Sequence, residues 1–335
     1  MTMRVLKPGM LSSFQDQGRT GHQPLGVSVV GAMDQRAHQL ANTLVGNLTD
    51  CASLEITLTG PTVEFTQACC IAICGADLSP SLNGKPIAMN RPLVVRAADA
   101  LSFGARRRGT RAYLAVHGGF AIPDVLGSQS TYLRSHFGGW QGRALKKGDE
   151  IPLKRPLLTT GRDGAGLENL AQALWAIKLY LPGAIAESTR VRVRLIKGLQ
   201  WEEFTAESRD ALLTQPYRIS PDSERMGYRL QGSDILMIKP RQMISEATTF
   251  GTIQVPAGGQ PIVLMADRQT TGGYPKIAYV ATIDLPLLAQ MGPGDNVQFE
   301  LVSLEAAQAL DITRTRAFIE LAQALSTVRT LLINH

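Results

Sequence analysis

The sequence predicts a mainly β protein, because short strand-like runs outnumber helical ones along its 335 residues. These runs are rich in Val, Ile, Leu and Thr and are bounded by Gly, Pro, Asn or Asp. They are Leu54–Phe65, Ala68–Leu78, Pro92–Phe103, Arg111–Val116, Arg192–Ile196, Ile235–Ile238, Gly251–Val255, Pro261–Met265 and Val297–Val302. The chain holds 32 glycines and 18 prolines, which favours many turns between short strands. Asn83-Gly84, between two such runs, predicts a tight turn.

Helical patterns are few. Apolar residues at helical spacing over Asp34–Val45 form one stripe, with Asp34 as the expected N-cap and Gly46 as the expected stop. A second helix is expected from about Leu167 to Leu179. A third is expected over roughly Ala306–Leu331, and a break near Asp311 is left open. The helices are therefore expected to be peripheral to the strands.

A short pattern recurs with the same spacing: Glu55, Thr57 and Gly60 return as Glu246, Thr248 and Gly251. Chance is one explanation, since identity between the two halves is low. The other is two copies of one β-rich unit, which two barrels would satisfy because closure removes exposed sheet edges. We therefore expect a first barrel over residues 1–155, a partly helical connector over 156–190, a second barrel over 191–304 and a helical tail over 305–335.

Charge and hydropathy exclude some classes of protein. The net charge of +6 is mild, and Arg106–Arg108 is the one tight basic cluster. With aromatic residues at 6%, this argues against a nucleic-acid-binding surface. The first residues lack a long apolar core, and the apolar stretch Leu170–Ala186 is cut by Lys178 and Pro182. A cytoplasmic protein without a membrane span is the expectation.

Several catalytic motifs are absent from the sequence. Gly84-Lys85 is followed by Pro86, so it is no phosphate-binding loop, and neither a GxSxG elbow nor an HExxH motif occurs. The four cysteines form no CxxC pair, so no metal site is expected, and they are interpreted as buried hydrophobic residues. His38 and His335 are interpreted as surface or packing residues. His117 and His136 are better candidates for a site, because each borders a glycine pair.

The polar stretch Asp267–Tyr274 follows an apolar strand and is too polar for a core. Arg268 offers a bidentate fork, Thr270 and Thr271 offer hydroxyls, and the glycines expose backbone N–H groups, which together suit a carboxylate or a planar amide. The alternative is a structural turn in which Asp267 and Arg268 satisfy each other. Catalytic roles are left unassigned, with Asp267, Arg268, Glu246 and Asp16 as candidates.

The remaining candidates have similar alternatives. Gln15, Asp16 and Arg19 form either a binding loop or a turn buttressed by an Asp–Arg pair. Glu55 and Glu246 either face a ligand or cap neighbouring backbone amides. The predicted substrate-binding residues are Gln15, Arg19, Glu55, Arg225, Gln254, Thr270, Thr271, Tyr274 and Lys276.

Two dense blocks carry a family resemblance. The first comprises Gln15-Asp16-Gln17-Gly18-Arg19-Thr20-Gly21, Gly31-Ala32-Met33-Asp34 and Leu54-Glu55. The second comprises Glu224-Arg225-Met226-Gly227-Tyr228, Gly251-Thr252-Ile253-Gln254-Val255-Pro256 and Met265 to Lys276. Together they resemble the KipA family, also called allophanate hydrolase subunit 2 or the C-type 5-oxoprolinase subunit. The resemblance runs from about Val5 to Leu301.

The resemblance implies two cyclophilin-like β-barrel subdomains, similar to half of the carboxyltransferase domain of urea amidolyase. It also implies one part of an ATP-dependent 5-oxoprolinase, which opens 5-oxo-L-proline to L-glutamate with a KipI-like partner and a LamB/YcsF-like partner. No cofactor is expected to be held by a recognisable motif of this chain. ATP with Mg is expected for the complex, and the isolated chain is expected to be inactive.

Two other functions are left open by the same resemblance. The barrels also serve the carboxyltransferase half of biotin-dependent urea or guanidine carboxylases. The chain has no biotin-carrier Met-Lys motif, so that function needs a separate carrier. The older family name implies instead a regulatory protein that antagonises a KipI-type kinase inhibitor, which requires only an interface.

Overall fold

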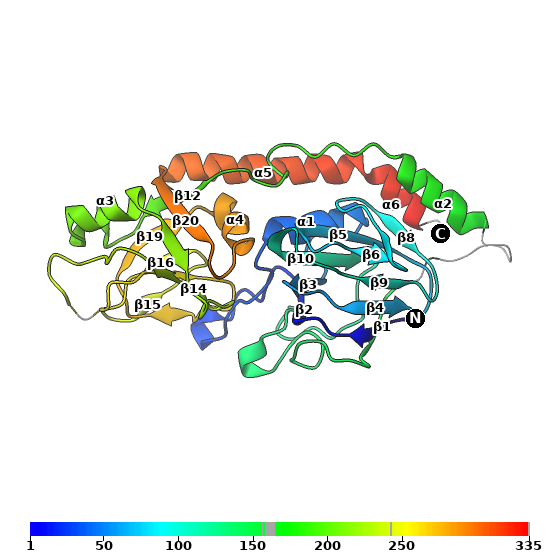
Figure 1. The fold of residues 1–335 in the computed structure, drawn as a ribbon, viewed down its shortest axis with the longest axis horizontal. Helices are drawn as coiled ribbons and strands as arrows, with labels where there is room; N and C mark the ends of the chain where they lie inside the picture. The colour runs from blue at the N-terminus through cyan, green and yellow to red at the C-terminus, as the bar shows by residue number, and fades with distance from the viewer. Residues whose placement is uncertain (156, 158–164, 242, 334–335) are drawn as a thin grey trace. The chain divides into compact units, whose positions relative to one another are not determined.

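The computed structural model describes residues 1–155, 157, 165–241 and 243–333. The fold is mainly β, as predicted (Figure 1). The chain forms two compact units, the first from residues 1–18, 34–186 and 315–335 and the second from residues 19–33 and 187–314. Segment 19–33 thus belongs to the second unit, although the sequence places it within the first expected barrel. The expected domain limits stay a prediction.

The first unit holds two antiparallel sheets in the described residues. One has the order β11 (Glu150–Pro152), β1 (Thr2–Lys7), β4 (Thr62–Phe65), β9 (Ala100–Ser102), β6 (Ser81–Leu82) and β7 (Lys85–Pro86). The other has the order β2 (Leu11–Gln15), β3 (Ser53–Thr57), β10 (Arg108–Val116), β5 (Cys69–Asp77) and β8 (Leu93–Val95). Asn83 and Gly84 join β6 to β7 with φ of 50° and 78°, which confirms the predicted tight turn.

The inner faces of these sheets form one apolar cluster that includes Phe14, Leu54, Phe65 and Val116. The cysteines of β5 are buried, as expected, and none of the four forms a disulfide. Burial raises the pKa of the Cys70 thiol to about 12, so it stays protonated at neutral pH. These thiols are therefore packing groups rather than nucleophiles.

Helix α1 (Gln35–Leu44) begins where the sequence predicts. Asp34 is the N-cap, and its Oδ1 accepts a hydrogen bond from the amide of Ala37 at 2.8 Å. Gly46, with φ of 72°, follows the last turn and supplies the left-handed residue that often ends a helix. The apolar stripe of α1 is buried, so the cap fixes a helix of the core.

Replacing Asp34 with alanine is expected to lower the free energy of unfolding by about 1–2 kcal/mol, because a helix N–H loses its acceptor. Urea unfolding of the full chain measures this loss. Asp34→Asn keeps a side-chain oxygen at the cap but removes the charge that pairs with Arg36 at 3.4 Å, so a loss smaller than that of Asp34→Ala is expected. Equal losses in both variants would contradict a capping role.

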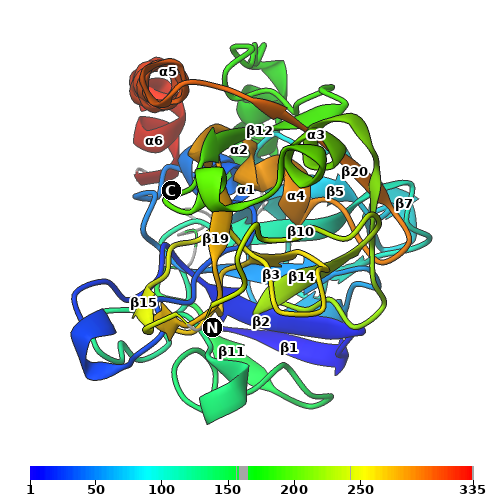
Figure 2. The ribbon, with the colours of Figure 1, turned by 90° about the vertical axis from the view of Figure 1, so that its left-hand side faces the viewer.

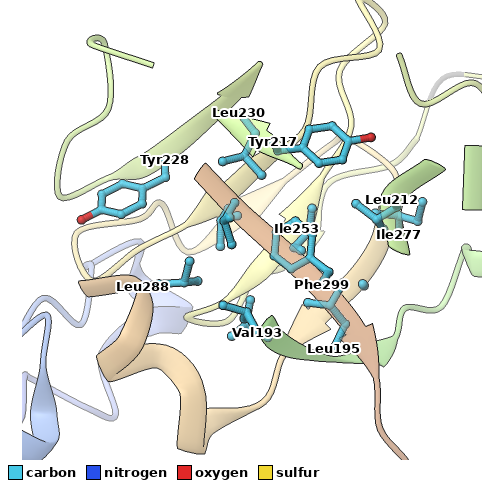
Figure 3. Close-up of a cluster of buried hydrophobic side chains, with 14 of the residues drawn as sticks. Val193, Leu195, Leu212, Tyr217, Tyr228, Leu230, Ile253, Ile277, Leu288 and Phe299 are labelled. Carbon is cyan, nitrogen blue, oxygen red and sulfur yellow. The ribbon is translucent and has the colours of Figure 1, made fainter. Parts of the chain in front are cut away.

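In the second unit, the described strands close into a seven-stranded barrel. Its order is β12 (Arg192–Lys197), β19 (Lys276–Val280), β16 (Thr252–Gln254), β17 (Ile262–Leu264), β14 (Gly227–Gln231), β13 (Tyr217–Ile219) and β20 (Asn296–Leu301). β12 and β20 pair in parallel, and the other neighbours are antiparallel. Side chains that fill the barrel include Val193, Leu195, Tyr217, Ile253 and Phe299 (Figure 3).

A separate hairpin accompanies the barrel. β15 (Glu246–Ala247) pairs with β18 (Thr271–Gly272) in a two-stranded sheet that is not part of the barrel order (Figure 2). The short helices α3 (Ala206–Thr214) and α4 (Leu285–Ala289) also belong to the second unit.

The prediction of a strand over Ile235–Ile238 is wrong. This segment forms only an isolated bridge from Met237 to Phe204, because its backbone bonds to the start of α3 instead of to a strand.

The remaining helices are α2 (Ala165–Ala176), α5 (Leu304–Ala324) and α6 (Ser326–Ile333). The tail is helical as predicted, and its break lies at Leu325 rather than near Asp311. Asp311 instead pairs with Arg314 one turn later, at 2.6 Å, within an unbroken helix. No helix in the described part of the chain has the length and apolarity that a membrane crossing requires.

Candidate active site

The structure places the predicted site residues in two groups. Gln15, Asp16 and Glu55 belong to the first unit. The second unit holds Arg19, Arg225, Glu246, Gln254, Asp267, Arg268, Thr270, Thr271, Tyr274 and Lys276.

Asp16 is a structural carboxylate. Its oxygens accept hydrogen bonds from the amide of Gly18 at 2.7 Å and from the Ser128 hydroxyl at 2.8 Å, and also from Gln129 and Ser130. The side chain is buried, so these donors hold the loop of residues 128–130 against the end of β2. Asp16 therefore buttresses a turn, but its partners are hydroxyls and amides rather than the arginine that the sequence suggested.

Glu55 lies in the middle of β3, in the five-stranded sheet of the first unit. Its Oε2 accepts a hydrogen bond from the hydroxyl of Tyr113 at 2.7 Å, and that hydroxyl accepts one from the amide of Asp34 at 2.7 Å. Arg111 lies 3.8 Å from the other carboxylate oxygen. Burial, and then the charges of Glu55 and Asp34, raise the pKa of Tyr113 well above its ordinary value, so Tyr113 remains a donor.

Gln15 lies nearby in β2 and is fully buried. Its Nε2 donates to the hydroxyl of Ser13 at 3.0 Å and to the carbonyl of Thr131 at 3.2 Å. Its Oε1 has no hydrogen-bond partner among the described residues. The sequence motifs did not single out Tyr113 as a site residue. Its role follows from strand register, which places it opposite Glu55 in the β3–β10 pair.

Glu55 and Glu246, which the repeat proposed from the sequence aligns, are not in equivalent positions. Glu55 is buried in the central sheet of the first unit, whereas Glu246 lies on the exposed two-stranded hairpin of the second unit. The shared spacing of Glu, Thr and Gly therefore does not identify a shared site.

In the second unit, Asp267 pairs with Arg225. The guanidinium donates from Nη2 to Oδ1 at 2.8 Å and from Nε to Oδ2 at 3.1 Å, and the amide of Asp267 donates to the carbonyl of Arg225 at 2.9 Å. Arg225 also donates to the carbonyl of Gly31 at 2.6 Å. Asp267 thus has a partner 42 residues away rather than the neighbouring Arg268, and the pair fastens segment 19–33 to the barrel. Arg19, buried in that segment, donates its amide to Val29 at 2.8 Å.

Arg268 differs from Arg225 because it has no carboxylate partner among the described residues. Its Nε is buried without an acceptor there, and its guanidinium carbon lies 5.9 Å from the centre of the Phe250 ring. Desolvation, opposed by the charge of Asp267, lowers the pKa of Arg268 to about 10, which leaves it cationic at neutral pH. The one hydrogen bond of Arg268 within the described part of the chain is a long one, from Nη1 to the Ala266 carbonyl at 3.5 Å. A desolvated cation without a carboxylate partner is the kind of group that marks a binding site for an anion or a carbonyl.

Lys276 begins β19 and is buried. Its ammonium lies 2.8 Å from Oε2 of Glu246, and the two side chains are 3% and 43% exposed. The hairpin that carries Glu246 is held by the pairing of Glu246 with Gly272 and by a hydrogen bond from the amide of Thr248 to Thr270 at 2.9 Å. A buried cation is therefore neutralised by a carboxylate on an exposed two-stranded hairpin.

Gln254 lies opposite Lys276 in the β16–β19 pair. A bulge shifts the register between Ile253 and Gln254, so that Ile277 and Ala278 both belong to the barrel core. Ile253 and Ile277, the neighbours of Gln254 and Lys276, point inward, so Gln254 and Lys276 lie on the outer face. The Nε2 of Gln254 is buried and has no acceptor among the described residues. A Cβ on Gly272 would lie 2.4 Å from this nitrogen, so the hairpin backbone covers it directly.

The hydroxyls and the aromatic ring of the predicted loop are less enclosed. Thr271 and Tyr274 are exposed, and Thr270 is half-buried with its carbonyl bonded to Thr248. Among the predicted site residues of the barrel, Arg268 and Gln254 each have a buried nitrogen without an acceptor in the described part of the chain, and Lys276 has a buried ammonium. A guanidinium or an ammonium can bind a carboxylate, and an amide N–H can donate to a carbonyl oxygen. No group of three or more His, Cys, Asp and Glu side chains that could hold a metal ion occurs among the described residues.

The histidines take structural positions where they are described. His38, expected to be a packing or surface residue, is buried and lies 2.7 Å from the Ser53 hydroxyl. His117, a candidate, is also buried, with Nδ1 2.8 Å from the Val45 carbonyl, and burial lowers its pKa. His136, the other candidate, is exposed in a turn with φ of 54°. His335 lies outside the described residues.

The hairpin is expected to loosen in acid. The hydrogen bond from Lys276 holds the pKa of Glu246 below its usual 4.5. The pairing is therefore fully present above pH 4.5 and is lost as pH falls through the lowered pKa. We expect the exchange protection of the Thr248 amide, corrected for its intrinsic rate, to fall in that range. In Glu246→Gln the same amide should show lower protection at neutral pH and no such step, and a step that persists in this variant would contradict the assignment.

The barrel carries a buried ammonium and a buried amide donor against a polar two-stranded hairpin, and the chemistry of these donors suits a carboxylate or a carbonyl group. Residues 25–301 match the family of the carboxyltransferase domain, subdomain A and B, and the chain belongs to this family. This confirms the resemblance drawn from the sequence motifs.

Particular relatives are similar over nearly the whole chain. The chain is 38% identical over 323 residues to the C-type 5-oxoprolinase subunit from Escherichia coli (strain K12), covering 96% of this chain and 98% of that protein. It is 36% identical over 299 residues to the C-type 5-oxoprolinase subunit from Haemophilus influenzae, covering 89% and 91%. A crystal structure of K. lactis urea amidolyase superposes with a TM-score of 0.85 at 30% identity, covering 96% of this chain and 20% of the larger one.

Proposed function

We propose that this chain is the C-type subunit of a cytoplasmic, ATP-dependent 5-oxoprolinase that converts 5-oxo-L-proline to L-glutamate. The observation that carries the proposal is the 38% identity to a C-type 5-oxoprolinase subunit, which extends over almost the full length of both proteins. The urea amidolyase, by contrast, is about five times longer than the part that this chain matches.

The geometry of the second unit supports the same substrate class. 5-Oxo-L-proline carries a carboxylate and a lactam carbonyl, which call for a cation and an N–H donor. Arg268 and Lys276 supply cations, and Gln254 supplies a buried amide N–H that lacks an acceptor among the described residues. Desolvation strengthens such contacts, because a buried donor gains more from an acceptor than an exposed one does.

The lactam carbonyl would be activated by phosphoryl transfer from ATP, and water would then open the ring. The sequence has no phosphate-binding loop, so ATP with Mg would be held by a KipI-like partner or a LamB/YcsF-like partner. The isolated chain would accordingly be inactive. Its contribution would be to bind and orient the lactam within the complex.

The proposal is tested by co-expressing the chain with its KipI-like and LamB/YcsF-like partners and measuring ATP-dependent glutamate release from 5-oxo-L-proline. Each chain is omitted in turn. Glutamate that appears only when all three are present supports the proposal. An intact complex that releases no glutamate, or full release without this chain, would refute it.

A second function has one observation in its favour. The fold of the urea amidolyase structure matches this chain with a TM-score of 0.85, so a carboxyltransferase half of a biotin-dependent urea or guanidine carboxylase is the alternative. That reaction needs a separate biotin carrier, because this chain has no carrier motif. Inhibition of urea- or guanidine-dependent turnover by avidin would favour this alternative over lactam cleavage.

A further inference from the structure

The outer face of the β16–β19 strand pair carries two polar groups that a folded barrel does not need. Lys276 is a cation with a side chain only 3% exposed, and Gln254 opposite it has a buried Nε2 without an acceptor in the described part of the chain. Burying either group costs free energy unless it is compensated. Their joint placement on one face therefore points to a ligand that supplies an anion and a carbonyl oxygen.

The compensation for Lys276 comes from an element that is easily displaced. Glu246 lies on a hairpin with two residues per strand, and 43% of its side chain is exposed. Two-stranded hairpins of this length have little stability of their own, and ion pairs with an exposed partner contribute little. The hairpin can therefore open at low cost, although it covers a buried cation when closed.

We infer that the carboxylate of Glu246 occupies the place of a substrate carboxylate, and that a ligand carboxylate displaces it to bind Lys276 while Gln254 donates to the adjacent carbonyl. The ligand class is a small carboxylate with a neighbouring amide or lactam carbonyl. The choice of 5-oxo-L-proline as the ligand rests on the proposed function, whereas the exchange of carboxylates rests on the geometry alone. Gly272 fits this arrangement, since it brings the hairpin backbone onto the Gln254 amide without a side chain.

The experiment is isothermal titration of the purified full-length chain, and of its complex with the two partner proteins, with 5-oxo-L-proline and with 2-pyrrolidinone. The second compound is the same lactam without a carboxylate. Lys276→Met is expected to weaken 5-oxo-L-proline binding at least about 10-fold and to leave 2-pyrrolidinone binding unchanged. Glu246→Gln, which removes the competing charge, is expected to tighten 5-oxo-L-proline binding several-fold, again without an effect on 2-pyrrolidinone.

Two more variants complete the design. Gln254→Leu is expected to weaken both compounds, because both carry the lactam carbonyl. Arg209→Gln removes a cation of the same unit that pairs with the exposed Glu202, and as the matched control it should change neither affinity. Thermal unfolding of each variant checks that it remains folded, and Lys276→Arg, which keeps the charge, should retain part of the affinity if Lys276→Met proves unstable.

The inference is overturned if Glu246→Gln weakens 5-oxo-L-proline as much as Lys276→Met does, or if Lys276→Met and Lys276→Arg both leave its affinity unchanged. The proposed function fails separately, when the assembled complex releases no glutamate. Carboxylate-dependent binding with the expected pattern, but without glutamate release, would keep the carboxylate site and reject the oxoprolinase. Glutamate release by the complex, together with unaltered binding in these variants, would keep the oxoprolinase function and reject the carboxylate site.

Discussion

Asp267→Ala is expected to lower the free energy of unfolding of the chain by about 3–5 kcal/mol, which is the usual cost of leaving one member of a buried ion pair alone. The Arg225 guanidinium makes two hydrogen bonds to Asp267, at 2.8 and 3.1 Å, and both side chains are only 6% exposed. Without the carboxylate, the buried cation loses both of these charge-assisted hydrogen bonds and keeps the one to the Gly31 carbonyl. Urea unfolding of the full chain measures the loss.

Two comparisons test this explanation. Arg225→Leu combined with Asp267→Ala should recover part of the stability, because no charge is then left buried without a partner. Glu203→Ala breaks the exposed pair with Arg241 and should cost less than about 1 kcal/mol. If Asp267→Ala lowers the free energy of unfolding no more than Glu203→Ala does, the buried pair does not stabilise the fold as its geometry indicates.

This expectation changes how activity data on Asp267 would be interpreted. The sequence made Asp267 a catalytic candidate beside Arg268, and it also left open a structural turn in which the two neighbours satisfy each other. The structure gives Asp267 a structural partner, but that partner is Arg225. Loss of activity in Asp267→Ala would therefore report loss of folding unless the variant's stability is measured in the same preparation.

Local patterns in the sequence were enough for the elements that depend on local chemistry. The Asp34 cap and the Asn83-Gly84 turn each involve residues a few positions apart, and both appear as predicted. The mainly β fold followed from the many short apolar runs. Ile235–Ile238 shows the limit of this method, since an apolar run of strand length can be buried against a helix start without joining a sheet.

The sequence identified residues of the candidate site, but it did not identify the residues that they contact. The decisive contacts of the site join residues far apart in the chain, such as Lys276 with Glu246 and Arg225 with Asp267. A strand of two residues, such as β15 or β18, leaves no periodicity to detect. The role of Tyr113 as a bridge from Glu55 to Asp34 likewise depends on strand register, which tertiary packing sets.

Arg268→Met is expected to leave the stability of the chain nearly unchanged and to reduce glutamate release by the assembled complex by about 10- to 100-fold. The range corresponds to about 1.5–3 kcal/mol for a lost hydrogen bond to a charged group. Stability should be retained because the guanidinium has no carboxylate partner in the described residues, and its Nε is buried without an acceptor. Methionine has a similar length and can fill the space beside Phe250 without a charge.

The contrast between two arginines of one unit makes this prediction specific. Arg225→Met removes a cation that holds Asp267, so it should lower stability strongly, and any loss of activity should follow unfolding. Arg268→Met should lower activity while the urea midpoint stays within experimental error of the parent chain. Arg268→Lys keeps the charge but not the planar fork, so partial activity is expected from it. A fully active Arg268→Met complex would exclude a role in substrate binding. A strongly destabilised but proportionately active one would make Arg268 a packing residue.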